Sequence, residues 1–212
     1  MKNKTFSKIV IASAILAGLW IVWGIIYPSG TWRYKMTVTV ATPEGIKTGS
    51  AVREVAVQLV PQITPEMKPS ITLAGEAVIV DLGERGILFA LLKGYKMTDH
   101  AKVLPFYVFP SAAVPLEKDG LSFYSSLKAG PKEVEPQFYP MFVHFRDTKD
   151  PKTVESLIEM EECPGRHAWP EPLCVKANHF EAMFGKGVYL KSVTLEMTDE
   201  AVTLGRLETL LS

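Results

Sequence analysis

The longest apolar stretch of the chain lies near its start. Residues 9–27 contain no charged side chain over nineteen positions, IVIASAILAGLWIVWGIIY. A helix of that length spans roughly 28 Å, close to the hydrocarbon thickness of a bilayer. Trp20, Trp23 and Tyr27 lie at its C-terminal end, where aromatic rings favour the membrane–water interface. The pattern therefore predicts an N-terminal transmembrane helix over residues 9–27.

The flanks of this stretch predict its orientation. Residues 1–8 form a basic segment with three lysines, which favours the cytoplasmic side, so the rest of the chain is expected in the periplasm as the outward domain of an inner-membrane protein. A cleaved signal peptide is the first alternative, but no Ala-x-Ala site follows the apolar run, which favours an uncleaved single-pass anchor. The second alternative is a domain tethered on the cytoplasmic side.

Residues 28–33 are interpreted as a linker, and residues 34–212 as one soluble domain, long enough to bury its own core. Alternating apolar and polar positions predict two strands joined by a turn at residues 42–45, and two further apolar runs around a glycine-bounded turn predict a second hairpin. The strands are expected at residues 32–41, 48–60, 76–82, 87–92, 141–146 and 187–198. A change of phase near Arg53 and Glu54 suggests a β-bulge in the second strand.

Helices are expected mainly in the C-terminal third. Asp150 followed by Pro151 is typical of a helix start and predicts a helix over residues 152–160, with shorter helices at 177–184 and 200–211. Residues 95–140 show little periodicity, apart from a short strand expected at 103–109, and the aromatic residues of this region are interpreted as core packing. The expected fold class is α+β: the transmembrane helix, then antiparallel β-hairpins, then a few short helices.

The balance of charges bears on the kind of partner that the protein could bind. Lys plus Arg number 23 and Asp plus Glu number 23, so the net charge is zero, and no basic run argues for a nucleic-acid partner. Neither a dinucleotide-binding nor a phosphate-binding glycine motif is present in the sequence, and no cofactor is expected.

The two cysteines, Cys163 and Cys174, are the sharpest local feature. In an exported domain such a pair is most simply a disulfide, here closing a short proline-containing segment. The alternative is tetrahedral zinc held by Cys163, His167, Cys174 and His179, although this spacing matches no common zinc finger.

Residues 144–155 hold the best candidates for catalysis. Asp147, Asp150 and Glu155 are close in sequence, and paired carboxylates can perform acid–base work, while His144 could act as a base. The simpler interpretation is that Asp150 caps a helix, Asp147 bonds loop amides and His144 is a structural histidine. A hydrolase-like enzyme built on these residues is the alternative function.

Four stretches of the chain resemble a family of uncharacterised proteobacterial membrane-anchored proteins with no assigned activity. They are TPEGIKTGSAVREV at 42–55, GEAVIVDLGERGILFALL at 75–92, FRDTKDPKTVE at 145–155 and FGKGVYLKSVTLEMTDEAVT at 184–203. The resemblance implies membrane attachment and assigns no functional residue. The neutral charge, the lack of a catalytic motif and the expectation of a tethered, sheet-rich domain favour a non-catalytic interaction or assembly module with a protein partner.

Overall fold

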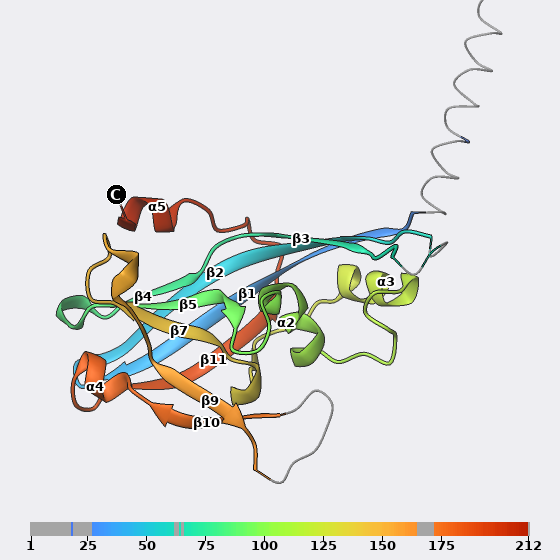
Figure 1. Cartoon of the computed structure of the whole chain (residues 1–212). Helices are drawn as coiled ribbons and strands as arrows, with labels where there is room; N and C mark the ends of the chain where they lie inside the picture. Colours follow the sequence, from blue (N-terminus) through green and yellow to red (C-terminus); the bar gives the residue numbers. More distant parts are fainter. Residues whose placement is uncertain (1–17, 19–26, 62–63, 65, 165–171, 212) are drawn as a thin grey trace, which may run out of the picture.

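The protein is built mainly from antiparallel β-sheet (Figure 1). The computed structural model describes residues 18, 27–61, 64, 66–164 and 172–211. Within these residues the strands form a five-stranded sheet in the order β3-β2-β1-β11-β6, a four-stranded sheet in the order β4-β5-β7-β8, and the two-stranded ribbon β10-β9. We call the first two sheet A and sheet B.

The hairpin of β1 (Ser29–Thr42) and β2 (Gly45–Gln58) is the centre of sheet A. The two strands pair without a break from Ser29 opposite Gln58 to Thr42 opposite Gly45, across the short turn at Pro43 and Glu44. Alternate residues of each strand face inward, so that one row of side chains from each strand is buried in the core. These inward rows are Trp32, Tyr34, Met36, Val38 and Val40 of β1, and Ala51, Arg53, Val55 and Val57 of β2.

The remaining strands of sheet A flank this hairpin. β11 (Tyr189–Met197) pairs with β1, and the two-residue β6 (Lys132–Glu133) pairs with β11. On the other side, β3 (Ser70–Ala74) pairs with the C-terminal part of β2, from Glu54 to Gln58. β3 therefore leaves the N-terminal half of the β2 edge uncovered.

Sheet B comprises β4 (Val78–Asp81), β5 (Ile87–Gly94), β7 (Pro140–Phe145) and β8 (Val154–Ser156). It approaches sheet A where β4 crosses β2. A Cβ atom added to Gly49 would lie 1.9 Å from the carbonyl oxygen of Ile79, so only glycine permits this approach of the two backbones.

Helices α2 (His100–Val108) and α3 (Lys118–Ser126) form from the region with little periodicity and pack against the start of β1. Pro105 lies inside α2 and cannot donate a backbone hydrogen bond to the carbonyl of Ala101. The hydroxyl of Tyr34 donates to that carbonyl instead, at 2.6 Å. The strand expected at residues 103–109 is therefore wrong.

The aromatic residues of this region pack on the core, as expected. Trp32 of β1 contacts the rings of Phe106 and Tyr124, at centroid separations of 5.8 and 5.6 Å. Phe142 of β7 contacts Tyr139 and Phe180.

The predicted α+β class is wrong in its balance of elements, because strands replace expected helices. The helix predicted over residues 152–160 is instead a 3-10 turn, η3 (Pro151–Thr153), followed by β8 and by β9 (Ile158–Glu162). Two further short 3-10 turns are η1 (Gly83–Arg85) and η2 (Pro136–Phe138). The expected linker at 28–33 belongs from Ser29 onward to β1. Of the later helices, α4 (Phe180–Phe184) and α5 (Arg206–Leu211) are present but short.

The predicted transmembrane segment, residues 9–27, lies outside the described residues except for Gly18 and Tyr27. Among the helices that the structure describes, none is long and apolar enough to cross a membrane, so the expectation of a transmembrane helix in the fold finds no structural support.

A small polar cluster lies inside the apolar core. The side chain of Arg53 is fully buried and donates from Nε to the carbonyl of Glu76 and from Nη2 to that of Ala90. His100, 2% exposed, lies with its Nε2 2.9 Å from the carbonyl of Phe138. Burial lowers the pKa of His100 to about 4, the Phe138 carbonyl opposes the shift, and the charge of Arg53 adds to it.

This histidine makes stability depend on pH. Its folded-state pKa of about 4 lies below the ordinary value of 6.5, so the unfolded chain binds the extra proton in between. We expect its contribution to be complete above pH 6.5 and to be lost as the pH falls towards 4, with a slope of at most about 1.4 kcal/mol per pH unit. Urea unfolding of wild type and His100→Gln at pH 7, 6 and 5 measures this.

The wild-type minus variant difference in unfolding free energy should shrink with falling pH. His179→Gln serves as the control, because His179 is only partly buried, with 36% of its side chain exposed. A difference in unfolding free energy between wild type and His100→Gln that stays constant from pH 7 to 5 would contradict the lowered pKa of His100.

Candidate functional site

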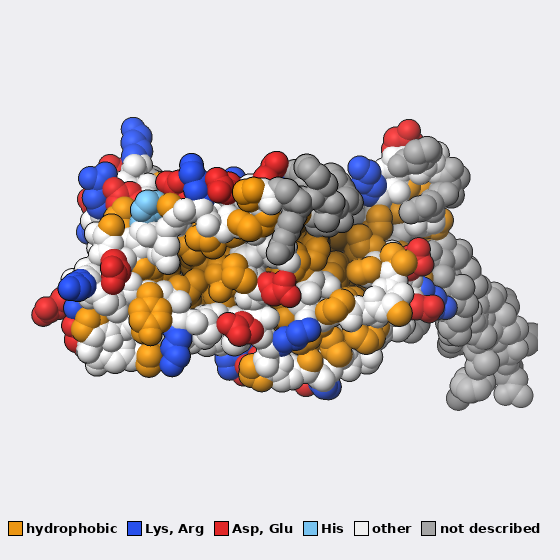
Figure 2. All heavy atoms as spheres, turned by 90° about the horizontal axis from the view of Figure 1, so that it is seen from below, with side chains coloured by type: hydrophobic (Ala, Val, Ile, Leu, Met, Phe, Trp, Pro, Cys, Tyr) orange, Lys and Arg blue, Asp and Glu red, His pale blue; other side chains and the backbone are white. Residues whose placement is uncertain are grey.

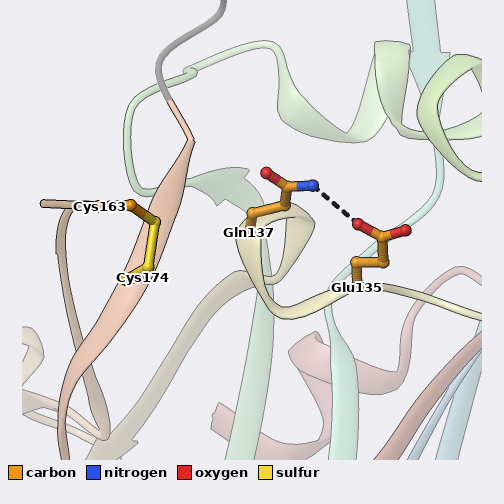
Figure 3. The surroundings of a disulfide bond; sticks show 4 residues. All are labelled: Glu135, Gln137, Cys163 and Cys174. Atoms are coloured by element: carbon orange, nitrogen blue, oxygen red, sulfur yellow. Dashed lines mark hydrogen bonds between the residues drawn. A yellow bond between two sulfur atoms is a disulfide. The ribbon is translucent and has the colours of Figure 1, made fainter. Parts of the chain in front are cut away.

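The predicted disulfide is present. Cys163 lies just after β9, and Cys174 lies in β10 (Leu173–Asn178), with their Cα atoms 5.0 Å apart (Figure 3). The segment between them was expected to be only a loop, but its flanks pair as an antiparallel ribbon from Leu173 opposite Glu162 to Asn178 opposite Ile158. The amide of Cys163 also donates to the carbonyl of Pro172. The disulfide thus closes the open end of this ribbon.

The zinc alternative does not assemble. Both cysteine sulfurs are bonded to each other, and Nε2 of His179 lies 3.3 Å from the carboxylate of Glu159. His167 lies outside the described residues. Within the part of the chain that the structure describes, no three His, Cys, Asp or Glu side chains form a metal-binding group.

The carboxylates at 147–155 serve local structure. Asp147 accepts from the amide of Lys149, and Asp150 accepts from the amide of Lys152 at the start of η3. Glu155 forms an ion pair with Arg146 at 2.8 Å. Asp150 therefore caps a 3-10 turn rather than the expected helix, and each carboxylate already has a structural partner.

His144 is likewise held in place. Its Nδ1 lies 2.9 Å from the carbonyl of Ile87, and its ring meets that of Phe184 edge-on at 5.1 Å. A Cβ atom on Gly86 would lie 2.9 Å from this ring, so the histidine fills the space above the turn of the second hairpin. These contacts match the structural interpretation of His144 and give no support to the hydrolase alternative.

The best candidate for a binding site is instead the outer edge of β2, which cannot be recognised from any single residue of the sequence. In an antiparallel strand, alternate residues direct their N–H and C=O groups to the same side. β3 pairs with this edge from Gln58 to Glu54. Next, Val52 exchanges hydrogen bonds with Thr203: the Val52 amide donates to Thr203 Oγ1 at 2.9 Å, and the Thr203 amide donates to the Val52 carbonyl at 3.0 Å.

The segment that follows β11, residues 198–211, thus continues the cover of β2 where β3 ends (Figure 1). Arg206 Nη1 donates to the carbonyl of Ser50, the next outward position. The segment is held further by the Glu76 carboxylate, which accepts from the amides of Arg206 and Leu207. By the same alternation, Thr48 and Ile46 direct their backbone groups outward, and neither has a bonded partner on that side within the described residues.

This cover also explains the phase change that suggested a bulge. The register of β1 and β2 is continuous, so there is no bulge between them. Val52 lies on the outer face but is 4% exposed, beside the segment containing Thr203, while Arg53 on the inner face lies in the core. Two neighbouring residues are thus buried on opposite faces.

A groove of about 590 Å³ lies beside the open positions. Its walls are the start of β2 on one side, with Ile79 and Asp81 of β4 and Arg206 on the others. Ile46 is 52% exposed and provides an apolar contact. The volume is in the range of ordinary binding pockets, and we call it the β2-edge groove.

The β2-edge groove carries an excess of positive charge. Lys47 and Arg206 line it and form no ion pair in the described part of the chain, whereas Asp81 is the one carboxylate of the lining and accepts from the amide of Gly83. Lys47 also lines a neighbouring pocket beside Glu44 and Arg85. Those two residues bond to each other, and the hydrogen bonds from Arg85 hold the pKa of Glu44 at about 2, so their charges are mutually satisfied.

A second surface is apolar. Figure 2 shows hydrophobic side chains gathered in a hollow across the middle of the lower face, with charged side chains around much of its rim. The hollow offers apolar area for contact. The β2-edge groove offers open backbone groups and cations, which can specify an occupant.

The disulfide is expected to stabilise the domain. Closing a loop with a sequence separation of 11 is worth about 3 kcal/mol in the chain-entropy model. We expect the double variant Cys163→Ala, Cys174→Ala to lose about that much unfolding free energy in urea titration. Thiol alkylation of unreduced wild type should label neither cysteine, and full labelling without reductant would contradict the bond.

Comparison with protein-family models, curated proteins and solved structures gives no match to this chain. The resemblance to a proteobacterial family stays an expectation from the sequence, and the function has to be argued from the geometry of the β2-edge groove.

Proposed function

We propose that this protein is a non-catalytic interaction module that binds a protein partner at the β2-edge groove. The observation that carries the proposal is the open edge at Thr48 and Ile46, whose outward backbone groups lie beside a groove of binding-site size. An unpaired strand edge is a template for another chain, and recognition by strand addition is a recurring mode of peptide binding.

The rest of β2 supports this proposal by contrast. The edge is covered by β3 at Glu54 to Gln58 and by residues 203–206 at Val52 and Ser50. Proteins commonly protect exposed strand edges by covering them or by placing charges there. Here the cover ends two outward residues before the turn, which leaves a defined place for a partner.

We also propose that residues 9–27 attach this domain to the inner membrane, with the domain on the periplasmic side. Support comes from the uncharged nineteen-residue stretch, from the lysines that precede it, and from the disulfide, because disulfides persist in oxidising compartments. The partner would then be met at or near the membrane surface.

Thr48→Pro tests the site. Proline removes the outward N–H but leaves the β1 pairing intact, because this N–H faces away from β1, and prolines are tolerated at such edge positions. We expect a partner that co-purifies with wild type from detergent extracts to be reduced at least about tenfold, the loss expected for about 1.4 kcal/mol. Thr48→Val, which keeps the N–H, is the matched control.

Equal recovery of the partner with both Thr48 variants would place the contact elsewhere. The alternative surface is then the apolar hollow of the lower face (Figure 2).

Protease accessibility tests the topology. We expect added protease to digest the domain only after the outer membrane has been permeabilised, because a periplasmic domain is shielded until then. Protection that persists until the inner membrane is opened would overturn the periplasmic placement, and release of the protein by a salt wash would overturn the attachment.

A further inference from the structure

The β2-edge groove also limits the chemistry of its occupant. Resting on the proposed function, we infer that the partner contributes an extended strand with an acidic side chain, added to β2 at Ile46 and Thr48. The occupant is a segment of another protein, not a second copy of this chain.

The backbone geometry requires an extended segment. Thr48 and Ile46 each present one N–H and one C=O outward, two residues apart, which is the spacing that a paired strand satisfies. The C-terminal segment shows that this edge accepts such bonds, since Thr203 already exchanges two of them with Val52. An incoming strand would continue that cover towards the turn.

The charges select the side chain. Lys47 lies between the two open positions, and the guanidinium of Arg206 lies at Ser50, next to them, where its Nη1 donates to the Ser50 carbonyl. Neither side chain forms an ion pair within the described residues. Asp81 lies across the groove, but its carboxylate is turned to the amide of Gly83. A glutamate or aspartate on the incoming strand would pair with these two cations, which no carboxylate of the described residues neutralises, whereas a lysine would be repelled.

Apolar contacts complete the fit. Ile46 is 52% exposed, and Ile79 of β4 lines the facing wall of the groove. A β-branched residue next to the acidic one in the strand would reach these side chains, because neighbouring residues of a strand face opposite sides.

A second copy fits this site less well. Copies paired through the same edge would bring Lys47 and Arg206 of one chain towards the Lys47 and Arg206 of the other, and the like charges would repel each other. This comparison leads us to commit to a different protein as the occupant.

The test uses full-length protein in detergent micelles and the synthetic peptide acetyl-TVEVTV-amide as the probe. Binding is followed by amide chemical shifts, and we expect saturable shifts of the Ile46 and Thr48 amides with a Kd on the order of 100 µM, as a few net hydrogen bonds would give. The same peptide with glutamine in place of glutamate should bind about threefold more weakly, and with lysine more weakly still.

Variants on the protein side make the charge test independent of the peptide. Lys47→Gln and Arg206→Gln should each weaken binding of the glutamate peptide about threefold and leave the glutamine peptide unchanged. Lys128→Gln is the matched control, because Lys128 is exposed, pairs with Asp199, and lines a different pocket. Thr48→Pro should also weaken binding of the glutamate peptide. If that variant does not fold, the same backbone contact is tested from the peptide side: a glutamate peptide with alternate amides N-methylated should not bind to the unchanged protein.

Each of the following results would overturn the inference. The first is equal affinity for the glutamate and glutamine peptides, and the second is a glutamate affinity that Lys47→Gln leaves unchanged. The third is concentration-dependent dimerisation that Thr48→Pro abolishes, which would identify a second copy as the occupant. If the peptides fail while the co-purified partner still depends on Thr48, the proposed function stands and the acidic strand is wrong.

Discussion

The buried guanidinium of Arg53 is the constraint on which the rest of the structure depends. A cation without exposure to solvent is costly unless its donors are satisfied. Here the acceptors are the carbonyls of Glu76 and Ala90 and the sulfur of Met36, with the ring of Tyr34 at 6.0 Å. These groups come from β1, from β5 and from the segment before β4, so satisfying one side chain fixes both sheets relative to β2.

Glu76, one of the residues that bond to Arg53, connects the core to the surface. While the carbonyl of Glu76 accepts from Arg53, its carboxylate accepts from the amides that begin α5. The core therefore positions the C-terminal segment, the segment covers β2 at Ser50 and Val52, and the end of that cover defines the open edge. The proposed binding surface thus arises from the place where a covering segment stops rather than from a cluster of reactive side chains.

The elements that the sequence predicted correctly are those whose pattern is local. Alternation of apolar and polar residues, with one change of phase in the second strand, identified the β1–β2 hairpin, and two apolar runs around a glycine turn identified β4 and β5. The failures have physical causes. Helix α2 was not predicted because it contains Pro105, which cannot donate a backbone hydrogen bond to the carbonyl of Ala101. The hydroxyl of Tyr34, which is distant in sequence, donates to that carbonyl instead. The helix start at Asp150 and Pro151 was real, but the turn ends after three residues because the chain then pairs as β8 with β7.

By itself, the sequence determined the hairpins, the uncharged stretch at residues 9–27 and the pairing of Cys163 with Cys174, since each depends on spacing along a short piece of chain. Only the tertiary structure decided that His144 and the carboxylates at 147–155 have local partners, and that Thr48 and Ile46 have none in the described residues. The reason is that the residues of a strand do not themselves indicate whether another segment of the chain covers their edge. Whether an edge is open depends on Thr203 and Arg206, which lie about 150 positions further along the chain.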